Sequence, residues 1–171
     1  MKPVIRNLLI VLIVAVAALA TFVLTPGSGQ PMPEISFTDI DGGEHRLADY
    51  KGQPILMIFW ATDCPGCIKE MPELITLYEN YARRGLAMIS VAMPHDYPEH
   101  IQAMREQKGL PYFITWDKTG RIAEAFDNVR VTPTHFLISP EGEIVMRKIG
   151  VLKIEQLEQR LATMGLTPTP S

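Results

Sequence analysis

Cys64 and Cys67 are the only two cysteines of the chain, and a Pro-Gly pair separates them. Two thiols three positions apart can close into a disulfide and reopen while the backbone moves little. A protein needs this property to exchange two electrons with the cysteines of another protein. The spacing therefore predicts a dithiol–disulfide redox site.

A zinc site is the alternative interpretation of a Cys-x-x-Cys pair. Zinc would need two further ligands at a workable spacing. The four histidines of the chain form no His-x-x-x-His pair, which disfavours zinc. We expect no metal ion, and no cofactor beyond the Cys64–Cys67 disulfide itself.

The residues on either side of the pair predict the elements that position it. The continuous apolar run Ile55–Ala61 is typical of a buried strand. After Cys67, apolar residues recur every three or four positions, which predicts a helix, and Pro65 suits its first position. Free N–H groups at the start of that helix favour a thiolate. We therefore expect Cys64 to be the outer, attacking thiol and Cys67 the inner, resolving thiol.

The rest of the chain shows an alternation of strand and helix patterns without internal repeats. A Gly-containing turn at Pro140–Glu143 favours a hairpin near the end. The expected order after the first helix is a strand at 86–93, a helix at 98–108, a strand at 113–116, a helix near 121–126, strands at 135–139 and 144–149, and a closing helix at 154–164.

Longer segments around the cysteines resemble a known family. Trp60–Pro72 and Val131–Ile138, which contains Thr-Pro-Thr, are similar to segments of the membrane-anchored thioredoxin-like proteins of the TlpA/ResA/CcmG group. Asp41–Gly43 with Leu47–Pro54 resembles the opening hairpin of that family. The likeness spans roughly residues 33–164. It implies a thioredoxin-like α/β fold, a central mixed sheet flanked by helices, with an N-terminal transmembrane helix.

The resemblance also implies a third catalytic residue beside the two thiols. Glu70 follows Cys67 by three positions and shares its helical face. Several anchored members of the family carry a matching Glu near the disulfide, and the resemblance implies that Glu70 acts as proton acceptor and donor for the inner thiol. A solvated surface carboxylate is the alternative for Glu70.

The substrate side of the site is implied by the resemblance as well. The family proline that matches Pro133 is cis and packs beside the disulfide. A cis bond there would turn the backbone of Thr132 toward the disulfide, where an extended substrate segment could pair with it. Trp60, Thr132 and Pro133 are accordingly the expected substrate-binding residues.

Three residues depart from family patterns or carry a polar group at an unusual place. Ile58 stands where cytosolic thioredoxins hold a buried Asp. Asp63 precedes Cys64, where the family has an uncharged residue, and it would oppose thiolate formation only if it points inward. His135 lies on a predicted strand, and we expect a structural role for it.

These features predict an enzyme, a thiol–disulfide oxidoreductase that reduces protein disulfides in the bacterial envelope, with cytochrome c maturation as one setting. A peroxidase of the peroxiredoxin type is one alternative. Peroxiredoxins place a Thr three residues before the attacking Cys, whereas here Ala61 holds that position and Thr62 the next. A copper-delivery module is the other alternative, but its relatives separate the cysteines by three residues rather than two.

Composition limits the partners of the chain. The formal net charge is −3 and no basic run occurs, so nucleic acid is not an expected partner. The expected partners are proteins that carry disulfides. A membrane electron donor is also expected, because an oxidising compartment requires the dithiol to be regenerated.

An apolar segment near the N-terminus predicts a membrane anchor. Leu8–Leu24 holds seventeen residues with one polar member, Thr21, and it follows Lys2 and Arg6. This length is at the short end of a membrane span, and the basic residues favour a cytoplasmic N-terminus. An uncleaved single-pass anchor in the inner membrane is favoured, with the domain in the periplasm or otherwise outside the cytoplasm. Cleavage near Ala18–Ala20 is the alternative.

The sequence thus divides into four predicted parts. The linker between anchor and domain is rich in Pro, Gly and Ser, which predicts a flexible or extended segment. The parts are an N-terminal membrane anchor at 1–25, a linker at 26–33, a thioredoxin-like domain at 34–166 and a flexible tail at 167–171.

Overall fold

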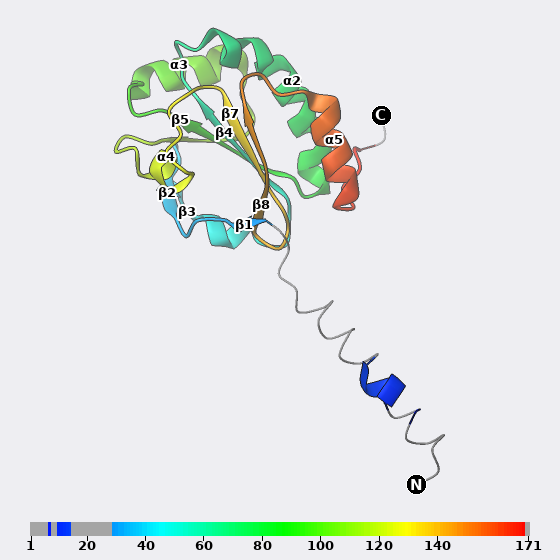
Figure 1. Ribbon diagram of the computed structural model, residues 1–171. Coiled ribbons are helices and arrows are strands. Elements are labelled where there is room, and N and C mark those ends of the chain that lie inside the picture. Colours follow the sequence, from blue (N-terminus) through cyan, green and yellow to red (C-terminus); the bar gives the residue numbers. More distant parts are fainter. Residues whose placement is uncertain (1–6, 8–9, 15–28, 170–171) are drawn as a thin grey trace.

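A six-stranded mixed sheet in the order β1-β8-β7-β4-β5-β6 forms the centre of the protein. The computed structural model describes residues 7, 10–14 and 29–169 (Figure 1). β4 pairs in parallel with β5, and β5 with β6, while the pairs that involve β7 and β8 are antiparallel. The strands are β1 Gln30–Pro31, β4 Ile55–Trp60, β5 Ala87–Ala92, β6 Phe113–Trp116, β7 Thr134–Ile138 and β8 Glu143–Ile149.

Helices cover both faces of this sheet. α2, α3 and α5 lie on one face, and α4 lies on the other together with the antiparallel hairpin β2–β3 (Figure 1). This arrangement is the expected thioredoxin-like sheet between helices. The bounds are β2 Ser36–Thr38, β3 Glu44–Arg46, α2 Pro65–Tyr81, α3 Pro98–Lys108, α4 Arg121–Ala125 and α5 Ile154–Thr163, with short 3-10 turns at Leu47–Tyr50 and Ala82–Arg84.

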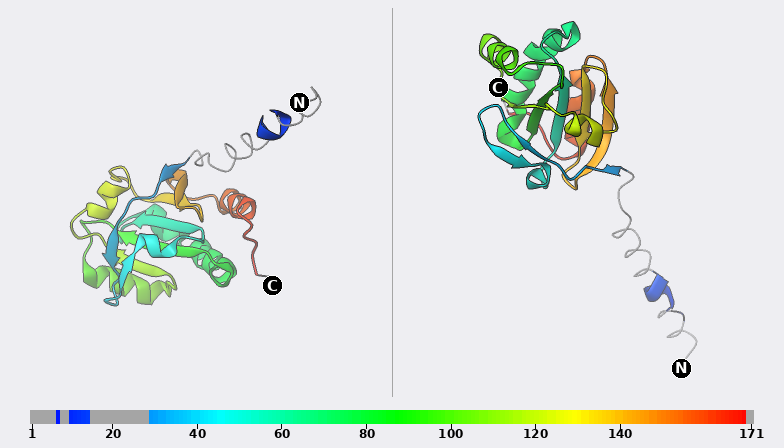
Figure 2. Two further views of the ribbon diagram at one scale, coloured as in Figure 1. Left: turned by 90° about the horizontal axis from the view of Figure 1, so that it is seen from below. Right: turned by 90° about the vertical axis from the view of Figure 1, so that its left-hand side faces the viewer.

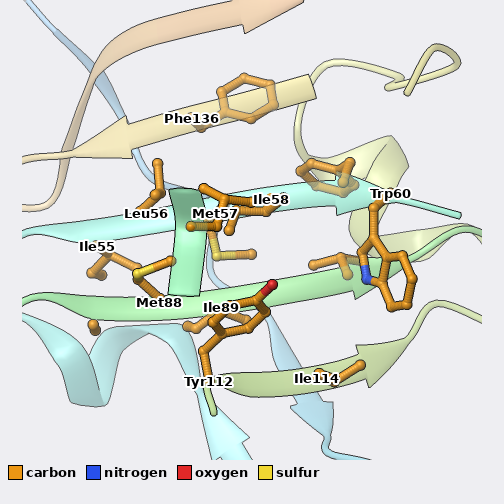
Figure 3. Packing of buried hydrophobic residues seen from close by; sticks show 14 of the residues in the cluster. Ile55, Leu56, Met57, Ile58, Trp60, Met88, Ile89, Tyr112, Ile114 and Phe136 are labelled. Carbon is orange, nitrogen blue, oxygen red and sulfur yellow. The ribbon is translucent and has the colours of Figure 1, made fainter. Parts of the chain in front are cut away.

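The two central strands are buried along their whole length, as their apolar runs predict. Every residue of β4 and of β5 is buried. On the face toward α4, the rings of Phe59, Phe126 and Phe136 pack with centroids 5.0–5.8 Å apart. Figure 3 shows the side chains of β4 and β5 interleaved with those of the neighbouring strands. This core fixes β4, and β4 in turn fixes the start of α2.

Several element boundaries agree with the sequence prediction. The helix predicted at 98–108 is α3, and it ends at Gly109, whose φ of 64° lies in the left-handed region. Glycine adopts this conformation without a side-chain clash, so it ends helices readily. The strand predicted at 113–116 is β6. The boundaries of α3 carry strong local signals, namely a proline at its start and a glycine after its end.

The structure differs from the prediction at both ends of the domain. Gln30–Pro31, within the segment expected to be a linker, forms β1 and pairs with the start of β8. In the tail expected to be flexible, the backbone N–H and the hydroxyl of Thr169 both donate to the carbonyl of Asn80 at 2.9 Å. Backbone pairing of this kind leaves no hydrophobic periodicity to detect.

The predicted membrane anchor lies mostly outside the described residues. Residues 10–14 are helical. Within the described part of the chain, no helix has both the length and the apolar character that crossing a membrane requires. The anchor and its position therefore remain predictions from the sequence.

Candidate active site

Cys64 and Cys67 form a disulfide where β4 leads into α2, with their Cα atoms 5.3 Å apart. Cys64 is the N-cap residue of the helix, and Pro65 occupies its first turn, as predicted. The backbone N–H of Cys67 donates to Cys64 Sγ at 3.2 Å. Cys64 is 8% exposed and Cys67 2% exposed, so a partner meets Cys64 first. The same N–H would stabilise a thiolate at Cys64 after reduction.

A buried carboxylate that sequence reasoning missed holds the loop before Cys64. Asp96 Oδ2 accepts the backbone N–H of Thr62 at 2.7 Å, and its Oδ1 accepts the Thr62 hydroxyl at 2.7 Å. Oδ1 also accepts the backbone N–H of Tyr97 at 2.9 Å. Asp96 is almost fully buried. It follows β5 closely, just as Thr62 follows β4, and the ends of adjacent parallel strands meet at one edge of a sheet. The only sequence signal for this contact was that both residues follow predicted neighbouring strands.

Pro133 lies against the turn between the two cysteines, in line with its expected place. The Thr132–Pro133 peptide is cis. A Cβ built on Gly66 would lie 3.3 Å from Pro133 Cδ and 3.6 Å from Val151 Cγ2. Pro133 is buried, whereas Thr132 is partly exposed. The Pro133 segment therefore forms the wall of the site beside the disulfide, and glycine between the cysteines allows this close approach.

Trp60 corrects one expectation. Its side chain is buried in the core at the end of β4, where Figure 3 shows the indole. Its Nε1 has no hydrogen-bond partner in the structure. A side chain enclosed in this way offers no surface to a substrate, because β4 is covered on both faces. Trp60 is therefore a core residue at the end of β4 and not a substrate contact.

Glu70 and His135 form a buried pair, and this overturns the surface alternative for Glu70. Glu70 Oε1 lies 2.9 Å from His135 Nε2, and the two side chains are 1% and 0% exposed. Glu70 Oε2 accepts the backbone N–H of Leu152 at 3.1 Å. Burial raises the pKa of Tyr112, and the nearby Glu70 carboxylate raises it further. The sequence singled out both residues but gave no reason to connect them.

Asp63 points to water, so its departure from the family pattern has a small electrostatic consequence. Its side chain is 76% exposed, and Oδ1 lies 3.4 Å from His95 Nε2. Solvent screens an exposed charge strongly. Asp63 and Asp96 thus flank the same loop in opposite environments, one solvated and one buried.

The arrangement provides the parts for thiol–disulfide exchange. Cys64 caps a helix N-terminus, the more deeply buried Cys67 lies one turn further along, and the buried Glu70 carboxylate follows on the next turn. In the described part of the chain, no group of three or more His, Cys, Asp or Glu side chains is placed to hold a metal ion. Two electrons and the accompanying protons can be stored here as a dithiol.

Sequence comparison gives a consistent family assignment. The model of the AhpC/TSA family matches residues 28–147. The chain is 32% identical over 136 residues to thiol-disulfide oxidoreductase ResA of Geobacillus kaustophilus, covering 80% of this chain and 77% of that protein. It is 35% identical over 133 residues to ResA of Bacillus anthracis, covering 76% and 74%.

Solved structures show the same fold. A thiol:disulfide interchange protein of the thioredoxin family from Chlorobium tepidum superposes with a TM-score of 0.73 at 21% identity, over 82% of this chain and 99% of that chain. StoA from Bacillus subtilis superposes with a TM-score of 0.64 at 25% identity, over 75% and 96%. Fold, paired cysteines and relatives therefore agree.

Proposed function

This chain belongs to the AhpC/TSA family and is a thiol–disulfide oxidoreductase, and we propose that it reduces disulfides of other proteins through Cys64 and Cys67. The observation that carries this proposal is the difference between the two sulfurs. Both cysteines are buried, but Cys64 caps the helix and is 8% exposed, whereas Cys67 is 2% exposed. In such a pair, one thiol can attack a substrate disulfide, and the other can then release the reduced substrate from the mixed disulfide.

The reaction begins with the Cys64 thiolate attacking one sulfur of a substrate disulfide. A Cys64–substrate bond forms, the substrate S–S bond breaks, and the released substrate thiolate takes a proton from water. The Cys67 thiol then loses its proton to Glu70, and its thiolate attacks Cys64 Sγ. The second substrate thiolate leaves and is protonated. The substrate gains two electrons, and the protein returns to the disulfide state seen in the structure.

The wall beside Cys64 supports the binding of extended substrate segments. Thr132 is partly exposed next to Pro133, so its backbone groups are candidates to pair with a substrate chain. Main-chain pairing would admit many sequences around the target cysteine. Thr132 and Pro133 thus remain our candidates for substrate contact.

The cellular setting of the proposal follows from the N-terminal sequence. The apolar segment and its preceding basic residues favour a single-pass anchor in the inner membrane with the domain outside the cytoplasm. In that setting a membrane electron donor regenerates the dithiol, and the cysteines of apocytochrome c are one candidate substrate. The reaction needs no cofactor beyond the disulfide.

The two alternative functions have less support. The Thr62 hydroxyl donates a hydrogen bond to Asp96 Oδ1. It therefore has a structural role in the loop and is not available to donate to a peroxide at Cys64. A copper-delivery role would need ligands beyond the two cysteines, and reduced protein titrated with Cu(I) would reveal it. Both alternatives also leave the buried Glu70 carboxylate, one helical turn from Cys67, without a role.

Insulin reduction tests the proposed function directly. We expect the dithiol-reduced wild type to reduce insulin disulfides and to end as the Cys64–Cys67 disulfide, with one substrate disulfide reduced per protein in a single turnover. The Cys64→Ser variant should lose this activity while it keeps the wild-type circular dichroism spectrum. An active Cys64→Ser variant, or an inert wild type, would overturn the proposal.

The two thiols should differ in reactivity once the disulfide is reduced. We expect iodoacetamide at pH 7 to modify Cys64 at least about tenfold faster than Cys67, because Cys64 is more exposed and receives the Cys67 N–H. Mass-spectrometric mapping of partially alkylated protein measures both rates. Faster modification of Cys67 would reverse the assigned roles.

Substitution of Glu70 should affect resolution more than attack. Glu70→Gln keeps the side-chain volume and removes the proposed proton acceptor one helical turn from Cys67, so we expect resolution to slow by roughly 10²-fold with an altered pH dependence. Stopped-flow measurement of mixed-disulfide decay gives this rate. The control is Glu73→Gln, an exposed acid on the same helix. An unchanged pH–rate profile would remove Glu70 from the reaction.

A further inference from the structure

We propose that His135 is a second proton site behind Cys67, sharing with Glu70 the proton that the Cys67 thiol releases. The inference rests on the proposed exchange reaction and assigns to His135 a positioning role that goes beyond it. It starts from a feature that the reaction of the two cysteines leaves unexplained. A histidine is fully buried in a strand whose other members are apolar or hydroxylated.

Glu70 links His135 to the N-terminal turn of α2, which carries Cys67. Glu70 Oε1 is 2.9 Å from His135 Nε2, and Glu70 lies one helical turn from Cys67. The other carboxylate oxygen is held by the N–H of Leu152. Glu70 is therefore fixed at both oxygens, and one of its two partners can itself gain or lose a proton.

The second ring nitrogen of His135, Nδ1, makes no hydrogen bond among the described residues, so the hydrogen-bonding capacity of the imidazole is only half used. This nitrogen is also buried. A buried polar atom without a partner costs free energy, so a purely structural histidine would be expected to bond through both nitrogens. The arrangement satisfies only the nitrogen that faces Glu70. This favours a role that depends on the Glu70 contact.

Neighbouring charges do not replace His135 as the partner of Glu70. On β8, Lys148 is the register partner of His135 and is partly exposed. No ion pair joins it to Glu70 among the residues that the structure describes. On β4 and β5 the adjacent side chains, Ile58 and Ser90, do not titrate. Tyr112 keeps its proton, because burial and the Glu70 carboxylate both raise its pKa.

The net charge of Glu70, His135 and Cys67 together explains the role that we assign to His135. A carboxylate alone would leave one uncompensated negative charge in the interior, and a Cys67 thiolate would add a second. A proton that moves from Cys67 Sγ to the Glu70–His135 pair keeps the total charge unchanged while it frees the sulfur electron pair for attack on Cys64. The imidazole gives the pair two groups that can hold the acquired proton. The proton returns to Cys67 when the disulfide is next reduced.

Nuclear magnetic resonance of the wild type tests this without any variant. With ring-labelled histidine, we expect the protonated fraction of the His135 imidazole at fixed pH to differ between the disulfide form and the dithiothreitol-reduced form. His45 also contacts a carboxylate, Asp39, at 2.8 Å, but it lies in the β2–β3 hairpin, and its signal should be the same in both forms. A His135 signal independent of redox state would overturn the proposal, whether or not insulin is reduced.

A kinetic comparison provides the second readout. In His135→Gln, the amide can still donate to Glu70 but cannot take up a proton, so we expect mixed-disulfide resolution to slow about tenfold and its pH–rate profile to lose one titration step. Attack by Cys64 should stay within twofold of wild type. The matched control is His45→Gln, which should change neither step. Thermal unfolding confirms that each variant is folded, and a His135→Gln profile identical to wild type would contradict the inference.

Discussion

In the Cys67→Ala variant, the mixed disulfide between Cys64 and a substrate cysteine is expected to accumulate to nearly one equivalent per protein. Cys67 is the covered sulfur, and only it is placed to attack Cys64 from the protein side. Without it, release depends on external thiols, and the adduct lifetime should approach the minutes to hours of uncatalysed disulfide rearrangement. Non-reducing gels and intact mass measure the adduct, and its mass identifies the partner.

Two outcomes would contradict this expectation. The Cys64→Ala variant is the matched control, because it keeps the more deeply buried thiol and loses the less buried one, so it should form little adduct. Equal trapping by both variants would mean that either sulfur can attack. Trapping by Cys64→Ala alone would reverse the roles assigned to the two cysteines.

Replacement of Asp96 by alanine should cause the largest loss of stability outside the hydrophobic core. The substitution removes one carboxylate that receives three hydrogen bonds, two from Thr62 and one from Tyr97. Donors that lose a buried partner cost about 1–3 kcal/mol each, and partial solvation reduces the sum, so we expect a loss of about 2–4 kcal/mol. Urea unfolding measures it. Alkylation of reduced Cys64 should change as well, because the preceding loop is released.

Asp63→Ala is the control for this prediction. Asp63 belongs to the same loop but is solvated, and removal of an exposed acid should change stability by less than about 0.5 kcal/mol. A similar loss in both variants would show that the loop responds to net charge and not to the buried contacts of Asp96. An Asp96→Ala protein as stable as wild type would contradict the prediction.

Local signals explain which parts of the fold the sequence predicts. Apolar runs define β4 and β5, and Pro65 fixes the start of α2 as Gly109 fixes the end of α3. These signals act within a few residues of the feature they determine. β1 has only two residues and is held by pairing with β8, so no local pattern marks it.

The parts of the site that sequence reasoning missed depend on contacts between distant residues. Glu70 and His135 are 65 positions apart, and Thr62 and Asp96 are 34 apart. Each residue taken alone has an ordinary structural explanation. The best clue to the first pair was a histidine within the apolar run of β7. Only the packing of α2 on the sheet connects these observations.

The position of β1 determines which end of the domain faces a support when the protein is attached through its N-terminal side. β1 pairs with Ile144, and Ile144 lies opposite Ile138, which pairs with the first residue of β4. The disulfide follows the last residue of β4, about 20 Å away along the strand. The right-hand view of Figure 2 shows β1 at one end of the sheet. A bead or a sensor chip attached ahead of β1 would therefore hold the domain at the end of the sheet opposite the disulfide. An immobilised copy should react with soluble disulfides as fast as a free one.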